Sequence, residues 1–142
     1  MHALHVVLAS DGSEGALRAA GWLKANFSPS DVRVTVVTVH HAPIDVGSPT
    51  FAPEPAYAEQ MEDAAINEAR RAVSRTEEAL ADFRPDCHVI GGMPMAEILI
   101  QFATDHRADV IVTGRRARGG LGLGSISRAL AHNAPVPIWV IP

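Results

Sequence analysis

The stretch VIVTGRRARGGLGLGSIS, residues 110–127, is the most informative part of this sequence. An apolar run ends at Gly114, a glycine-rich and cationic loop follows, and Gly124-Ser125 opens a helical pattern. Glycines let backbone amides approach an anion, and a helix N-terminus adds unpaired N–H groups and the positive end of the helix dipole. The stretch therefore predicts a strand, a loop and a helix with the chemistry of a phosphate site.

The loop differs from the two common phosphate-binding motifs. It lacks the Gly-Lys-Ser/Thr ending of a Walker loop and the GxGxxG spacing of a dinucleotide-binding turn. Arg115, Arg116 and Arg118 place positive charge on a chain whose net charge is −4. Two interpretations stay open on the residues alone, a phosphate cradle and a glycine-rich connection whose arginines are simply solvated.

Outward from this stretch, short apolar runs rich in β-branched residues predict buried parallel strands. These runs are Leu4–Ala9, Val32–Val39, Cys87–Ile90, Asp109–Thr113 and Val136–Ile141. Helical periodicity between them predicts four helices. We expect these from Ser13-Glu14 to about Phe27, from Ala56 to Phe83, from Pro94 to about Arg107, and from Ser125, as N-cap, to about Asn133.

The helix predicted from Ala56 to Phe83 is amphipathic. Its buried stripe is expected to contain Met61, Ala65, Ala69, Ala72, Val73, Thr76, Leu80 and Phe83. A proline-rich segment from Ala42 to Pro55 precedes this helix, and it is longer than most connections. We interpret that segment as a functional or poorly ordered loop.

Strands that alternate with helices predict an α/β fold, a parallel sheet covered on both faces. Right-handed crossovers make it doubly wound, with the ligand crevice at the carboxyl ends of the strands where the winding reverses. The loops after the first and fourth strands flank such a crevice. We expect residues 1–142 to form a single domain.

Composition excludes several classes of function. The acidic net charge disfavours nucleic-acid partners, and no apolar run is long enough to span a membrane. The first residues lack a secretory pattern, and Cys87 is the only cysteine, so we expect a protein of the reducing cytoplasm.

Metal-assisted and nucleophilic chemistry find little support. His40 and His41 would point to opposite faces of a strand, and His88, His106 and His132 are isolated in the sequence, so we expect no metal site. No serine lies in a GxSxG motif, and an apolar strand should leave the Cys87 thiol inert. We expect no catalytic residue.

Three segments, in this order, resemble the universal stress protein family. They are VLASDGS at 7–13, ADVIVTG at 108–114, and GSIS at 124–127 followed by AHNAPVPIWV at 131–140. The resemblance spans nearly the whole chain. It implies a five-stranded α/β sandwich with strand order 3-2-1-4-5, a homodimer paired through the last strand, and in many members bound ATP. A Mg²⁺ ion carried on the ATP phosphates would need no dedicated protein cage.

The match to the family's ATP-binding pattern, G-x2-G-x9-G-[S/T], is imperfect. Gly114 fits the first glycine and Gly124-Ser125 fits the end, but Ala117 stands where the second glycine belongs. Only six residues separate Ala117 from Gly124, three fewer than in the pattern. An alanine lacks the backbone conformational freedom of glycine. Along a different loop path, that freedom would come from Gly119, Gly120 and Gly122.

The resemblance also implies site residues. The adenosine contacts would fall on Ala9, Ser10 and Asp11, with Val39 against the base. The phosphate contacts would fall on Gly114, Gly124, Ser125, Ile126 and Ser127. Asp11 can accept a hydrogen bond from an adenine amine or a ribose hydroxyl, although Asp11-Gly12-Ser13 could equally be a plain turn and helix cap.

Three functional hypotheses follow. The first is an ATP-binding homodimer that acts in stress signalling without efficient catalysis, and the apolar last strand suits self-pairing. The second is the same fold without a nucleotide, acting through protein–protein contacts. The third, an adenine-nucleotide enzyme such as a nucleotidyl transferase, is disfavoured because no second substrate domain is visible.

Overall fold

The computed structural model describes residues 3–40, 55–115 and 124–142. Its strands are β1 (Leu4–Ala9), β2 (Val32–His40), β3 (Asp86–Gly91), β4 (Val110–Gly114) and β5 (Ile138–Ile141). Its helices are α1 (Glu14–Asn26), α2 (Pro55–Ala79), α3 (Met95–Asp105) and α4 (Ser125–Asn133), with a 3₁₀ turn at Ala81–Phe83. None of these helices has the length and apolar character needed to cross a bilayer.

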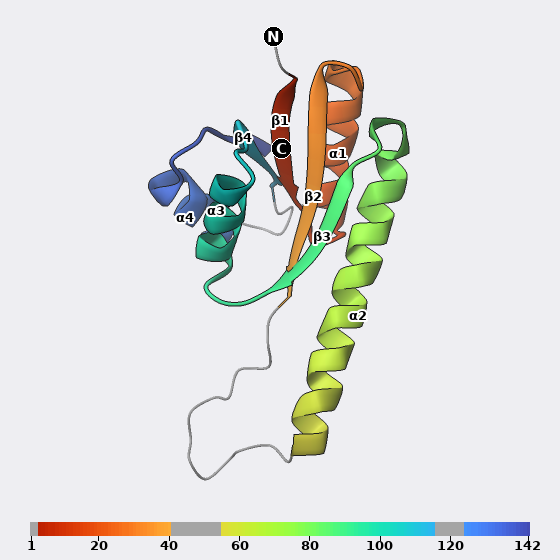
Figure 1. The fold of residues 1–142 in the computed structure, drawn as a ribbon, viewed down its shortest axis with the longest axis vertical. Coiled ribbons are helices and arrows are strands. Elements are labelled where there is room, and N and C mark those ends of the chain that lie inside the picture. Colours follow the sequence, from red (N-terminus) through yellow and green to blue (C-terminus); the bar gives the residue numbers. More distant parts are fainter. Residues whose placement is uncertain (1–2, 41–54, 116–123) are drawn as a thin grey trace.

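The five strands form one parallel sheet in the order β3-β2-β1-β4-β5 (Figure 1). The predicted α/β class and the strand order 3-2-1-4-5 are therefore confirmed. The winding reverses between β1 and β4, which pair directly from Val6 with Val110 to Ala9 with Thr113. The carboxyl ends of these two strands therefore flank the expected crevice.

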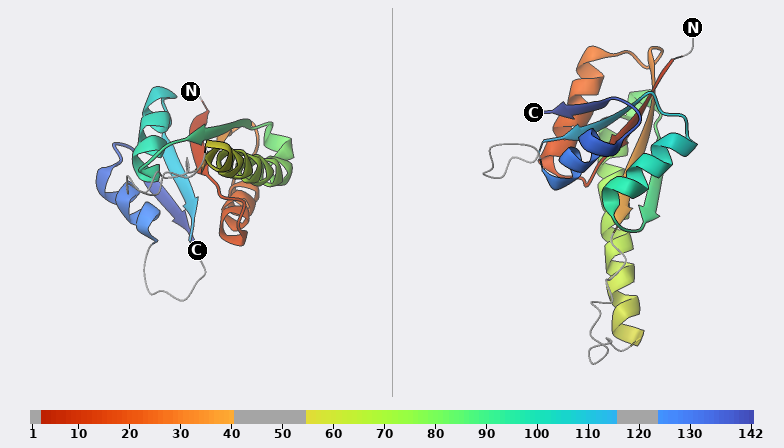
Figure 2. Two further views of the ribbon diagram at one scale, coloured as in Figure 1. Left: turned by 90° about the horizontal axis from the view of Figure 1, so that it is seen from below. Right: turned by 90° about the vertical axis from the view of Figure 1, so that its left-hand side faces the viewer.

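Helices cover both faces of the sheet (Figure 2). Val6, Leu8, Val34 and Val36 pack on one face against α1 and the end of α2. The alternate residues Val7 and Val37 pack on the other face against α3 and α4. Successive strand residues point to opposite faces, and because both faces are covered, apolar residues such as Val6-Val7-Leu8 and Val36-Val37 follow one another directly.

Several predicted boundaries differ from the structure. The last strand begins at Ile138, because Pro137 cannot donate to the ladder, although its carbonyl accepts from the N–H of Ile111 at 3.0 Å. Pro94 is the N-cap of α3 and not its first helical residue. The predicted loop from Ala42 lies outside the described residues as far as position 54, and Pro55 already belongs to α2.

The buried stripe of α2 is confirmed over its carboxyl half. Ala69, Ala72, Val73 and Thr76 are buried against the sheet. Met61 was predicted to be buried with them, and this was wrong, because its side chain is 44% exposed. The periodicity of a helix identifies its apolar face but not how far along that face the sheet extends.

His5 lies buried on β1 and forms a hydrogen bond between its Nε2 and Thr35 Oγ1 at 2.8 Å. Burial, together with the nearby Arg33 charge, lowers the pKa of His5 below its ordinary value of 6.5. The folded protein therefore holds this imidazole neutral at a pH where the unfolded chain would protonate it. The contribution of His5 to stability is present above pH 6.5 and is lost as the pH falls toward the folded-state pKa.

We expect the free energy of unfolding to decrease between pH 7.5 and pH 5.5, with the His5→Gln variant decreasing less. Urea denaturation at several pH values measures this effect. His132→Gln, which changes an exposed histidine, is the control and should follow the wild type. Equal pH dependence in His5→Gln and the wild type would contradict the assignment.

Candidate functional site

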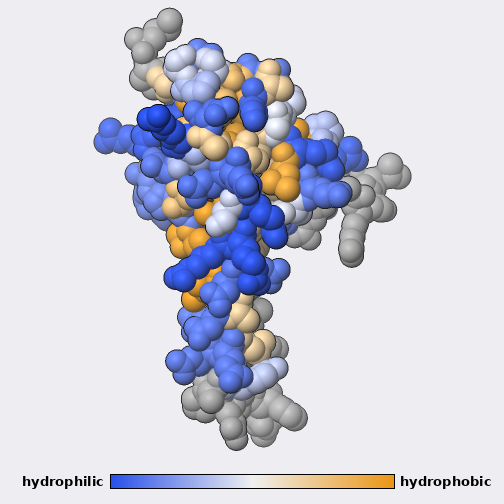
Figure 3. Space-filling view, turned by 90° about the vertical axis from the view of Figure 1, so that its right-hand side faces the viewer, coloured by the Kyte–Doolittle hydropathy of each residue, from blue (hydrophilic) through white to orange (hydrophobic). Residues whose placement is uncertain are grey.

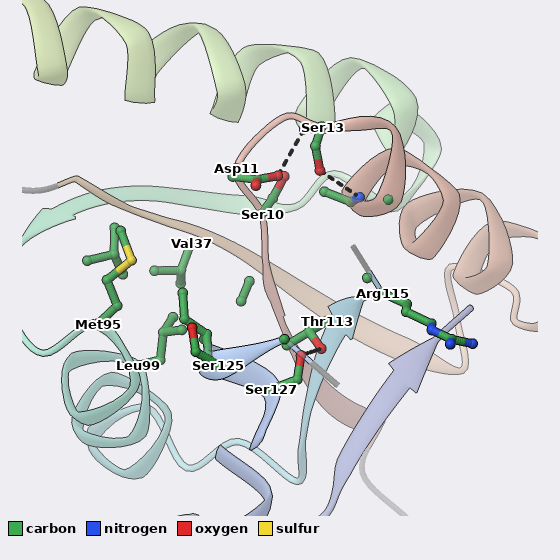
Figure 4. A pocket seen from close by; sticks show the side chains of 17 residues that line it. Ser10, Asp11, Ser13, Val37, Met95, Leu99, Thr113, Arg115, Ser125 and Ser127 are labelled. Atoms are coloured by element: carbon green, nitrogen blue, oxygen red, sulfur yellow. Dashed lines mark hydrogen bonds between the residues drawn. The ribbon is translucent and has the colours of Figure 1, made fainter. Parts of the chain in front are cut away.

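A cleft opens at the carboxyl ends of β1 and β4, where the winding of the sheet reverses (Figure 4). The structure brings all nine sequence-predicted residues together in its lining. They are Ala9, Ser10, Asp11, Val39, Gly114, Gly124, Ser125, Ile126 and Ser127. The cavity has a volume of about 120 Å³, several times the roughly 15 Å³ that one water molecule needs.

Eight further residues line the cleft and were not predicted from the sequence. They are Ser13, Gly15, Ala16, Val37, Met95, Leu99, Thr113 and Arg115. Val37 could have been found from Val39, since residues two apart on a strand share a face. Met95 and Leu99 lie four apart on one face of α3, but only the tertiary structure shows that this face meets the cleft.

The two sides of the cleft differ in chemistry. Val37, Met95 and Leu99 form an apolar wall, while Asp11 and Ser13 lie in the turn that follows β1 (Figure 4). A flat aromatic ring can pack on the apolar wall, and polar groups can then fix its orientation. The cleft is therefore suited to a ligand with an apolar and a polar end.

The turn after β1 is held by its own hydrogen bonds. The N–H of Ser13 donates to Asp11 Oδ1 at 3.0 Å, and the Ser13 side chain caps α1 by accepting from the N–H of Ala16. Gly12 adopts a φ of +74°, which favours glycine. The turn-and-cap interpretation of this segment is thus correct, and it is compatible with a ligand contact because Asp11 also lines the cleft.

A buried chain of hydrogen bonds connects this turn to α2. Thr76 Oγ1 donates to the carbonyl of Ala72 at 2.8 Å, so its only proton is used. Ser10 Oγ must therefore donate to Thr76 Oγ1, at 2.7 Å, while it accepts from the N–H of Gly12 at 3.1 Å. The Ser10 hydroxyl is thus committed to positioning the turn.

Thr76→Val is expected to lower the free energy of unfolding by about 1–3 kcal/mol, because it leaves the buried Ser10 hydroxyl without an acceptor. Thr104→Val is a matched control, since Thr104 Oγ1 makes the same type of bond to Ile100 at 2.8 Å but is exposed. That control should change stability by less than about 0.5 kcal/mol. Equal losses in urea denaturation would show that the bond to Ser10 contributes nothing.

Two glycines let the first turn of α1 pack directly on the end of β4. A Cβ on Gly15 would lie 2.7 Å from the carbonyl oxygen of Arg115, and a Cβ on Gly114 would collide with the backbone of Gly15. Gly114 was predicted as a phosphate contact, and in the structure its lack of a Cβ permits this close packing. The signal for Gly15, a glycine in the first turn of a helix, was present in the sequence but was not used.

The N-terminus of α4 opens into the cleft. Gly124 is its N-cap, with no side-chain cap bond, and the first helical bond runs from Arg128 N–H to the Gly124 carbonyl at 3.0 Å. The prediction that Ser125 caps this helix was wrong, because Ser125 is its first helical residue and its side chain is exposed. The amides of residues 125–127 therefore have no intrahelical acceptor, which is the arrangement that binds anions.

Hydroxyl groups lie beside these amides. Ser127 Oγ and Thr113 Oγ1 are hydrogen-bonded at 3.2 Å and connect α4 to β4. The side chain of Arg115 extends away from the apolar wall in Figure 4 and is exposed. Arg116, Arg118, Ala117 and the loop glycines 119, 120 and 122 lie outside the described residues.

Outside the cleft, Cys87, His88 and His106 carry reactive or metal-binding side chains, and their surroundings determine their chemistry. Burial, reinforced by the neighbouring Glu77, raises the pKa of the Cys87 thiol to about 12, so the thiolate nucleophile is scarce at neutral pH. His88 and His106 are not isolated in space, since their ring centroids lie 5.6 Å apart beside Phe102. No group of three potential metal ligands occurs among the residues that the structure describes.

Comparison with known proteins agrees with this fold. The model of the universal stress protein family matches residues 3–142. A universal stress protein of Thermus aquaticus, whose gene lies 3′ of that for QAH/OAS sulfhydrylase, is 34% identical, and the alignment covers 96% of each chain.

Solved structures show the same architecture at low identity. The universal stress protein UspA from Lactobacillus plantarum superposes with a TM-score of 0.78 at 19% identity, covering 100% of this chain and 99% of the other. A family member from Arabidopsis thaliana, solved with AMP bound, has a TM-score of 0.67 at 18% identity. The alignment covers 97% of this chain and 90% of the other. Together, the family match over residues 3–142 and the 34% identity to the Thermus aquaticus protein establish that this chain belongs to the universal stress protein family.

Proposed function

We propose that this protein binds an adenine nucleotide, ATP in the first instance, in the cleft between β1 and β4. The observation that carries the proposal is the convergence of the Asp11 turn, an apolar wall and the N-terminus of α4, whose N-cap Gly124 makes no side-chain cap bond, in one cavity. The AMP bound to the Arabidopsis thaliana relative supports an adenine nucleotide as the ligand class.

In this proposal the adenine ring packs against Val37, Val39 and Leu99. Asp11 accepts a hydrogen bond from the adenine amine or the ribose, as a carboxylate lining the same cavity can. The Ser10 side chain is already committed to Thr76 and Gly12, and its N–H donates to the carbonyl of Val37, so Ser10 contributes through its backbone carbonyl oxygen. This division uses the apolar side of the cleft for the base and the polar turn for orientation.

The phosphates lie at the N-terminus of α4. The amides of residues 125–127 donate to phosphate oxygens, the Ser125 hydroxyl adds a further donor, and the helix dipole favours the negative charge. Mg²⁺ enters on the phosphates and needs no protein carboxylate.

The cellular role that we propose is binding and signalling in the cytoplasm rather than catalysis. A homodimer forms through β5, which lies at the edge of the sheet. Within the chain, the Trp139 ring on this strand stacks on the Phe27 ring, with the two ring centroids 6.1 Å apart. Sedimentation equilibrium of the purified protein tests this part, because a dimer has twice the chain mass of 15.1 kDa.

Two measurements test nucleotide binding. Mass analysis of small molecules released by denaturing freshly purified protein should reveal an adenine nucleotide. Calorimetric titration of ligand-free protein with ATP, AMP and cyclic AMP should give saturable binding of one nucleotide per chain. Absence of both a released nucleotide and a heat of binding would favour the second hypothesis, a universal stress protein that acts without nucleotide, for which the shortened 114–124 loop provides the reason.

A further inference from the structure

Most described side chains in the amino-terminal half of α2 are exposed, and only Ala65 and Ile66 among them are half-buried. The helix has 25 residues, which corresponds to about 37 Å, and it extends well past the sheet (Figures 1 and 2). None of the side chains described from Tyr57 to Glu68 is buried, whereas Ala69, Ala72 and Val73 are. This half of the helix is not explained by the fold or by the nucleotide site.

An apolar stripe runs along this half of the helix. Tyr57, Met61 and Ala65 are spaced four residues apart and therefore lie in line on one side. Tyr57 is 57% exposed and Met61 is 44% exposed. The face of α2 that is visible in Figure 3 is largely hydrophilic, so this half of the helix is amphipathic.

The same segment carries the net charge of the protein. Residues 55–69 contain Glu59, Glu62, Asp63 and Glu68 and no lysine or arginine. The rest of the chain has twelve acidic and twelve basic residues, so it is neutral overall. Glu62 and Glu68 lie three residues on either side of Ala65 and therefore flank the apolar stripe.

We propose that this half of α2 is a docking surface for a basic, amphipathic helix of a partner protein. A helical segment without packing is marginally stable in water, so a partner that covers the stripe would stabilise it. A partner with lysine or arginine around an apolar face complements Glu62 and Glu68. A second copy of this chain fits less well, because two such segments would bring like charges together. This inference is independent of nucleotide binding.

The test uses the full chain and a fluorescent 18-residue peptide of leucine and lysine that forms a cationic amphipathic helix. Fluorescence anisotropy should show saturable one-to-one binding. Tyr57→Ser combined with Met61→Ser should weaken the affinity on the order of tenfold, since it removes the apolar contacts and keeps the charge. Glu62→Gln combined with Glu68→Gln should weaken binding several-fold at low salt and flatten its salt dependence.

The controls separate this surface from general attraction to an acidic protein. Glu78→Gln combined with Asp82→Asn removes two exposed acids near the other end of α2 and should leave the affinity unchanged. A shuffled peptide of the same composition, without an apolar face, should not bind. The proposal is overturned if the shuffled peptide binds as tightly as the amphipathic one. It is also overturned if the Tyr57→Ser/Met61→Ser and Glu62→Gln/Glu68→Gln variants both bind the peptide like the wild type. It is also overturned if sedimentation shows self-association that Tyr57→Ser/Met61→Ser abolishes, which would make a second copy the occupant. Circular dichroism verifies that each variant is folded.

Discussion

Gly124→Asp is expected to abolish nucleotide binding while making the protein slightly more stable. Gly124 is the N-cap of α4 with φ −63° and ψ 164°, a conformation that aspartate adopts without strain. Aspartate is among the best N-cap residues, and its charge interacts favourably with the helix dipole. The free energy of unfolding should therefore rise by about 0.5 kcal/mol.

The same carboxylate occupies the position proposed for the phosphates. It satisfies the first-turn amides of α4, and it repels an anion with an energy of about 4 kcal/mol at 4 Å separation near a protein surface. We expect the affinity for ATP to fall by at least about a hundredfold, which corresponds to roughly 2.7 kcal/mol. A rise in the free energy of unfolding together with a fall in ATP affinity would show that the substitution removes the binding site without damaging the fold.

Calorimetric titration and urea denaturation of the same preparations provide the two readouts. Gly124→Ser is the matched control, because serine caps the helix without adding charge. It should retain most of the affinity. If Gly124→Asp binds ATP as the wild type does, the phosphates do not lie at the N-terminus of α4.

Gly114→Ala is expected to lower the free energy of unfolding by about 3 kcal/mol. The added Cβ would collide with the carbonyl of Gly15 and lie 2.9 Å from the amide nitrogen of Ala16. These are backbone atoms in the first turn of α1, so no flexible side chain can move aside and α1 itself must shift. Forcing one methyl group into such a contact has a cost typical of severe overpacking. Nucleotide binding should weaken as well, because the end of β4 lines the cleft.

Gly21→Ala makes the same chemical change where there is space. Gly21 lies within α1 and a Cβ there would meet no atom within 4 Å. Replacing a glycine by alanine in a helix interior stabilises it by about 1 kcal/mol. Urea denaturation should therefore give opposite signs for the two substitutions, and a similar effect of both would contradict the close approach of α1 and β4.

Much of the fold could be predicted from the sequence because short-range patterns determine it. The apolar runs that became β1, β2 and β4 have the β-branched composition of buried parallel strands. Alternation with helices then restricts the connections to right-handed crossovers, and this leaves the cleft at the ends of β1 and β4. The specific strand order came from the resemblance to the universal stress proteins and was confirmed by the structure.

The wrong predictions fall where one local sequence pattern is compatible with two different structures. Gly124 and Ser125 can both cap a helix, and the sequence does not show that the chain turns at Gly124 so that Ser125 becomes the first helical residue. Met61 continues an apolar stripe that is buried only from Ala69 onward. Helical periodicity carries no information about where the supporting sheet ends.

The amino-acid sequence by itself determined the parallel α/β architecture, and its resemblance to the universal stress proteins supplied the nine predicted residues that converge in the cleft. Only the tertiary structure decided that Met95 and Leu99 of α3 face that cleft and that Thr76 on α2 holds the turn at Ser10. It also showed that no described side chain from Tyr57 to Glu68 of α2 is buried. The physical reason is one of range. Strand and helix preferences arise from neighbouring residues, whereas these contacts join segments far apart in the sequence, 66 residues apart for Ser10 and Thr76, and depend on how the helices pack on the sheet.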